Sequence, residues 1–286
     1  MDITSQVIDA INGWLQSLAA HLLRPALAAA GQLLFQTPAY DSIPEVGHAW
    51  ALVRSVTDGL FVIALLAAGV MVMASGTVES RYSAKALIPR IVLAAIAANA
   101  SLALCGGLIK LDNALINGLL GPDPGTSTFG QLSAIVQSPH AADQVVGSLV
   151  GLAAAVLAIL LVALYIGRDV VLLVATVLSP LALATYALPQ TDEIARIWWR
   201  VFSALLFVQV IQAILVEVGI ELLRHTDWLG GPVSDLTSGL VLITLLYLLF
   251  KLPFAAYHWA FRHPLSRSPV VQTAVTAAKL VAAAVA

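Results

Sequence analysis

Four polar side chains lie inside apolar stretches of the sequence, where a charge or an amide group needs a partner. Arg168 and Asp169 interrupt the long apolar block Val145–Leu188. If this block crosses a bilayer, a charge in it costs roughly 2.5–3.5 kcal/mol on insertion scales unless it is paired or hydrated. Two interpretations of Arg168 stay open. It faces inward, beside a polar passage or a partner on another helix, or it snorkels or is neutralised by Asp169 at a helix end.

Gln209 and Gln212 are the other two of these residues. They are three positions apart and therefore share one face of a helix. Hydrogen bonds between helices are the simpler explanation of such a pair, and we favour them over the lining of a conduit. Trp198, at the start of the same apolar stretch, fits the aromatic belt of a membrane interface.

Signatures of catalysis are missing from the sequence. It contains no HExxH, no GxSxG and no P-loop, and its six histidines are scattered. Cys105 is the single cysteine, so the chain cannot form an internal disulfide or a multi-thiolate metal site. We therefore expect no catalytic residue, no cofactor and no metal site.

The composition indicates which elements must position these side chains. Of the 286 residues, 60% are hydrophobic and 10% are charged, whereas about 25% of residues in soluble domains are charged. This composition predicts an all-α, polytopic helical membrane protein with about five transmembrane helices. The expected spans are Gly59–Ser75, Leu87–Leu108, one within Val145–Leu188, Ile197–Val218 and Leu240–Ala256.

Three regions outside these spans complete the predicted organisation. Residues 1–57 form an extracytoplasmic or interfacial region that begins with an amphipathic helix bent or restarted near Pro25. Within the bundle of residues 58–260, residues 110–144 are too polar, and too rich in Pro and Gly, to span, and they predict a loop. Residues 261–286 form a basic cytoplasmic tail.

The distribution of Lys and Arg favours five crossings over six. If Val145–Leu188 crosses once, nine basic residues flank the spans on one side and four on the other, which obeys the positive-inside rule. This places the N-terminus outside and the C-terminus in the cytoplasm. The surplus length of the block then belongs to a long tilted helix that breaks near Pro180, or to a re-entrant segment. A tight helical hairpin at Gly167-Arg168-Asp169, giving six crossings, stays open.

The stretch YIGRDVVLLVATVLSPLALATYALPQTDEIARIWWRVFSALLFVQVIQAILVEVG resembles the TrbL/VirB-type polytopic membrane subunit of type IV secretion and conjugation systems. The similarity covers about Val145–Gly219. The matching positions are Arg168, Pro180-Leu181-Ala182, Pro189-Gln190-Thr191, Trp198 or Trp199, and Gln209 with Gln212. Family members often carry a large extracytoplasmic loop or a long polar C-terminal extension, whereas this sequence shows a central loop of 35 residues and a tail of 26 residues after Ala260.

The resemblance implies a subunit of the bacterial cytoplasmic membrane that scaffolds a machine for moving DNA or protein. Its partners would be the lipid bilayer, other membrane subunits, separate secretion ATPases, further copies of itself and the transported substrate. The polar segment around Arg168 would contribute to a hydrated path. The alternative is a membrane subunit of a small-solute permease, although the sequence shows neither internal repeats nor ion-coupling carboxylates in mid-span.

Overall fold

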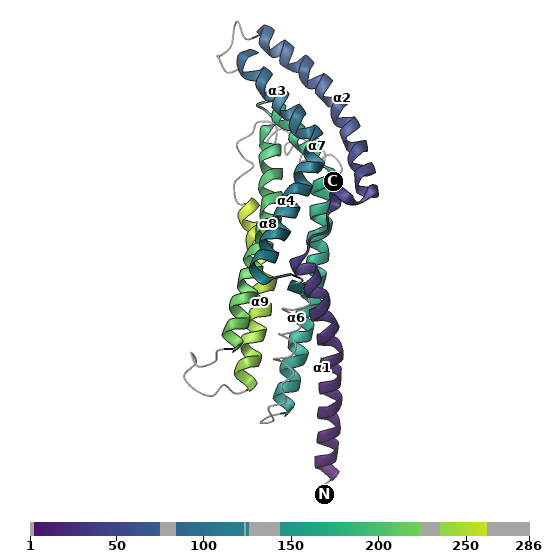
Figure 1. Cartoon of the computed structure of the whole chain (residues 1–286), viewed down its shortest axis with the longest axis vertical. Helices are drawn as coiled ribbons and strands as arrows, with labels where there is room; N and C mark the ends of the chain where they lie inside the picture. Colours follow the sequence, from purple (N-terminus) through teal and green to yellow (C-terminus); the bar gives the residue numbers. More distant parts are fainter. Residues whose placement is uncertain (1–2, 75–83, 123, 126–143, 225–234, 262–286) are drawn as a thin grey trace, which may run out of the picture. The chain divides into compact units, whose positions relative to one another are not determined.

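The computed structural model describes residues 3–74, 84–122, 124–125, 144–224 and 235–261. These residues form helices joined by turns, and they contain no strand (Figure 1). The chain divides into two compact units. Unit 1 comprises Met1–Pro38, Lys110–Val170 and Leu205–Ala256, and unit 2 comprises Ala39–Ile109, Val171–Ala204 and Tyr257–Ala286.

The described helices confirm a polytopic helical membrane protein. Four are long and apolar enough to cross a membrane, namely α2 (Pro44–Ala74), α4 (Ser101–Leu120), α6 (Gln144–Val177) and α8 (Asp192–Arg224). Two shorter apolar segments, Leu87–Asn99 and Leu240–Ala256, lie in α3 (Ala84–Asn99) and α9 (Asp235–Phe261). Four of the expected spans overlap α2, α6, α8 and α9, whereas the expected span Leu87–Leu108 crosses the boundary between α3 and α4 and ends within α4.

Unit 1 is built around the second half of α1 (Ile3–Phe35). Leu23, Leu27, Ala30 and Leu34 recur at helical spacing and are buried, so one face of α1 belongs to the core. That core also contains residues of α4, α6, α8 and α9. Pro25 lies inside α1 without interrupting it. The predicted N-terminal helix is therefore present, but its second half is part of a packed core and its interfacial location stays a prediction.

Unit 2 contains η1 (Tyr40–Ser42), α2, α3, α7 (Ser179–Ala184) and η3 (Thr185–Ala187). The helix α3 packs against α7 and η3, and α2 packs against α7. An ion pair joins Arg90 Nη2 to Asp192 Oδ2, and Arg90 Nε donates to the carbonyl oxygen of Tyr186. These contacts tie α3 to the start of α8.

The structure corrects the predicted boundaries in two places. Because α2 begins at Pro44, the region 1–57 includes the first turns of a membrane helix. The predicted loop 110–144 is wrong for residues 110–120, which are the second half of α4. Their polar side chains misled the prediction, since Asp112 is buried inside unit 1. The helix ends at Leu120, and it is followed by Gly121, whose φ of 83° suits glycine. Residues 126–143 lie outside the described residues.

The long apolar block is one continuous helix as far as Val177, so the alternative hairpin at Gly167-Arg168-Asp169 is wrong. The chain restarts as α7 at Ser179, with Pro180 in its first turn, where a missing N–H costs no helical hydrogen bond. The predicted break near Pro180 is confirmed. Of the predicted tail 261–286, residues 262–286 lie outside the described residues.

Candidate functional site

Arg168 lies within α6, and its side chain is 1% exposed, inside unit 1. A buried guanidinium group has five N–H donors and no acceptor, so it needs oxygen atoms around it. Burial of the charge is tolerable only where those donors are satisfied. Helix α6 provides the position and one of the oxygen atoms, that of Asp169, and the other oxygen atoms come from other parts of the chain.

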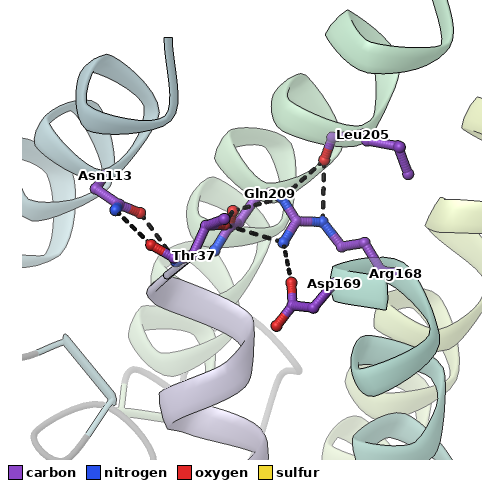
Figure 2. A network of polar contacts seen from close by, with 6 residues as sticks. All are labelled: Thr37, Asn113, Arg168, Asp169, Leu205 and Gln209. Carbon is purple, nitrogen blue, oxygen red and sulfur yellow. Dashed lines mark hydrogen bonds and ion pairs between the residues drawn. The ribbon is translucent and has the colours of Figure 1, made fainter. Parts of the chain in front are cut away.

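All five donors of Arg168 have acceptors within hydrogen-bonding distance (Figure 2). Nε and Nη2 both donate to the carbonyl oxygen of Leu205 in α8, at 3.0 and 2.8 Å. Nη2 also donates to Gln209 Oε1 at 2.7 Å. Nη1 donates to Thr37 Oγ1 at 3.1 Å and to Asp169 Oδ1 at 3.0 Å. The guanidinium group thus joins α6, α8 and the segment after α1.

Thr37 and Asn113 complete this arrangement, although neither is among the predicted site residues. The Thr37 hydroxyl accepts from Arg168 and donates to Gln209 Oε1 at 2.8 Å. Asn113 of α4 holds the Thr37 backbone: its Oδ1 accepts from the Thr37 N–H at 3.0 Å, and its Nδ2 donates to the Thr37 carbonyl at 2.9 Å. Four parts of the chain therefore meet at one polar cluster, which we call the Arg168 cluster (Thr37, Asn113, Arg168, Asp169, Leu205 and Gln209).

Gln212 lies one turn beyond Gln209 on α8 and makes a separate contact. Its Nε2 donates to the carbonyl oxygen of Leu249 in α9 at 2.9 Å. Both glutamines are fully buried, so their polar atoms face other helices. The sequence-based preference for hydrogen bonds between helices agrees with this geometry.

Three predicted site residues belong to unit 2 and are not members of the Arg168 cluster. Pro180 is buried at the start of α7. Pro189 lies in the turn before α8, where Thr191 N donates to the Leu188 carbonyl at 3.1 Å. Trp198 Nε1 donates to the Ala175 carbonyl at 2.9 Å, and its ring stacks on Phe202 with centroids 5.1 Å apart. Their contacts shape the α6–α7–α8 connection of that unit.

The Arg168 cluster can join helices, because its hydrogen bonds run between separate parts of the chain. Asp169 forms an ion pair with Arg168, and the side chain of Asp169 is 14% exposed. Asp112 is a second buried carboxyl group, close enough to Arg168 for their charges to interact. Among the described residues, no three His, Cys, Asp or Glu side chains are grouped so that they could hold a metal ion. The geometry is that of an inward-facing Arg with partners on other helices, the first of the two interpretations.

Comparison with known proteins identifies the family. The family model described as TrbL/VirB6 plasmid conjugal transfer-like protein matches residues 1–286, which confirms the resemblance found in the sequence. Comparisons with curated proteins and with solved structures found no match. With its polytopic helical fold and a family match along all 286 residues, the chain belongs to the TrbL/VirB6 plasmid conjugal transfer-like family and is a membrane subunit of a conjugal transfer or type IV secretion system.

Proposed function

We propose that this protein is a scaffold subunit in the bacterial cytoplasmic membrane, and that the Arg168 cluster holds its helices in the arrangement that the transfer machine needs. The observation that carries this proposal is the complete pairing of the guanidinium donors inside unit 1. A buried charge with five internal bonds fixes the relative positions of the groups that bind it.

The same observation favours a scaffolding role for Arg168 over contact with the cargo. A side chain that binds the DNA backbone must present free N–H donors to phosphate oxygens. The side chain of Arg168 is buried and its five donors are occupied. In this proposal Arg168 acts by assembling the bundle, and a substrate path would be lined by other residues.

The outer surfaces of the helices support a subunit that contacts lipid and other membrane proteins. In the most apolar stretch of α2, 11% of the residues are buried, compared with 50% in the corresponding stretch of α8. Large apolar side chains such as Leu52, Ile63 and Leu66 are more than 60% exposed on α2. Exposed apolar surface of this extent fits lipid tails or other subunits.

The proposal includes an orientation and an energy source. The excess of Lys and Arg on one side of the spans orients the N-terminus outside and the C-terminus in the cytoplasm. Separate ATPases of the machine would supply energy, since the sequence contains no nucleotide-binding motif.

An in-frame deletion tests the proposed function. We expect loss of transfer of a mobilisable plasmid or of a secreted substrate, with normal growth and normal uptake of small solutes. Gentle purification of the full chain should recover a secretion ATPase, whereas the chain alone should not hydrolyse ATP. Complementation with the wild-type gene serves as the control. Normal transfer combined with loss of uptake of one solute would instead establish a permease.

A further inference from the structure

A second polar layer, formed by Tyr165, Gln209 and Gln212, adjoins the Arg168 cluster and shares Gln209 with it, and three of its buried atoms make no hydrogen bond of standard geometry. These atoms are Gln209 Nε2, Gln212 Oε1 and the Tyr165 hydroxyl oxygen. All three side chains are fully buried. A buried polar group without a partner costs about 1–3 kcal/mol, so three such groups on two adjoining turns favour a bound ligand.

The orientations of the two amide groups follow from the partners that they already have. Gln209 must turn its oxygen toward Arg168, because a guanidinium group only donates. Gln212 must turn its nitrogen toward the carbonyl oxygen of Leu249, which only accepts. Gln209 therefore presents a free N–H donor, and Gln212 presents a free carbonyl acceptor.

The three groups are neighbours by the register of α6 and α8. Arg168 binds Gln209 three residues before Gln212 on α8. The Tyr165 hydroxyl, three residues before Arg168 on α6, is close enough to the Gln212 amide to interact with it, but the two groups do not form a hydrogen bond of standard geometry. The two helices are thus antiparallel at this level, and residues three apart on each share a face. Tyr165 contributes a hydroxyl group that can both donate and accept.

The layer is closed along the helix axis. On one side lies the Arg168 cluster, whose guanidinium donors are all occupied. On the other side, one turn away, Leu161 and Val216 are fully buried members of the apolar core. A ligand in this layer would be isolated from bulk solvent.

We propose that the Tyr165–Gln209–Gln212 layer binds an ordered water molecule between α6 and α8. Water fits the groups presented, since it can accept from Gln209 Nε2, donate to Gln212 Oε1 and exchange a hydrogen bond with Tyr165. Buried waters in proteins make about three such bonds. The water links the Arg168 cluster to the contact between Gln212 and α9, and extends the polar connection to that helix.

Hydroxyl-radical footprinting by X-ray radiolysis tests this site, because the radiation makes radicals from bound water in place. The full chain in lipid nanodiscs is irradiated, and the modified residues are quantified by mass spectrometry. We expect Tyr165 to be modified several-fold faster than Phe35, an aromatic side chain that is equally buried in the same unit. Each rate is normalised to that of the same residue in the unfolded chain.

Two further readouts make the test specific. Gln212→Met keeps the side-chain volume but removes the acceptor, and should lower the rate at Tyr165 toward that of Phe35. Leu161 and Val216 should stay unmodified, as expected for a closed layer. Equal rates at Tyr165 and Phe35 in the wild-type chain would overturn the proposal without any variant. Rapid modification of Leu161 and Val216 would indicate a continuous water-filled path and would overturn the proposal of a single bound water.

Discussion

Replacement of Arg168 by alanine is the most direct perturbation of the Arg168 cluster. It removes five hydrogen bonds and leaves Asp169, Gln209 and Thr37 without their shared partner. Four of these bonds run to other parts of the chain. Hydrogen bonds between membrane helices contribute about 0.6 kcal/mol each on average, which gives about 2.4 kcal/mol for four. Breaking a buried ion pair from one side costs about 3–5 kcal/mol. We therefore expect Arg168→Ala to lower the free energy of unfolding by about 3–5 kcal/mol.

Two matched variants separate the effect of geometry from that of charge. Arg168→Lys keeps the positive charge but offers three donors without the planar fork, so it should cost less than alanine while remaining clearly destabilising. Arg196→Ala removes an arginine whose side chain is 62% exposed and pairs with Asp192 one turn away. Such exposed pairs contribute about 0.3–0.5 kcal/mol, so this variant should be close to wild type.

The assay is unfolding of the purified chain in mixed micelles with increasing SDS, followed by circular dichroism or by loss of the folded peak in gel filtration. A loss of 3 kcal/mol corresponds to a drop of more than a hundredfold in the ratio of folded to unfolded protein. Plasmid transfer by the same variants should follow the same order. If Arg168→Ala and Arg196→Ala unfold at the same SDS concentration, the inference that the Arg168 cluster joins the helices is refuted.

Three further predictions follow from other contacts. Asn113→Leu should destabilise the chain by about 1–3 kcal/mol in the same unfolding assay, because the backbone N–H and carbonyl of Thr37 lose their partner. The control Asn117→Leu, at an exposed position of α4, should have little effect. Gly125→Ala should lower the free energy of unfolding by about 1–3 kcal/mol, because the added Cβ would lie 2.9 Å from the backbone of Gly31. The control Gly118→Ala, whose added Cβ would meet no atom within 4 Å, should be neutral or stabilising, and thermal unfolding measures both variants. Reporter fusions after Ala286 and within residues 76–85 should report the cytoplasm, and fusions near Gly125 the outside; a tail reporting the outside would contradict the five-crossing orientation.

The sequence by itself determined the class of the protein and showed that Arg168 places a charge inside an apolar span, which is energetically costly. An apolar composition and runs of spanning length can be satisfied only by membrane helices, so the α-helical class and the approximate spans could be predicted. The same reasoning indicated that the charge of Arg168 must be paired or hydrated, while it left an inward-facing and a snorkelling side chain both open. It favoured hydrogen bonds between helices for Gln209 and Gln212. Pro180 marked the break after α6 because proline cannot continue a helical hydrogen-bond pattern.

Only the tertiary structure decided which groups meet Arg168. Thr37 is 131 positions away in sequence, and Leu205 contributes a backbone carbonyl, a group that every residue possesses. Asn113 was placed in a loop because its neighbourhood is polar, yet Asp112 is buried and Asn113 binds the Thr37 backbone inside unit 1. Hydrophobic periodicity reports which face of a helix is apolar, but the pairing of polar groups depends on the register between helices. That register is set by side-chain packing along their whole length, as in the alignment of Arg168 with Gln209 and of Tyr165 with Gln212.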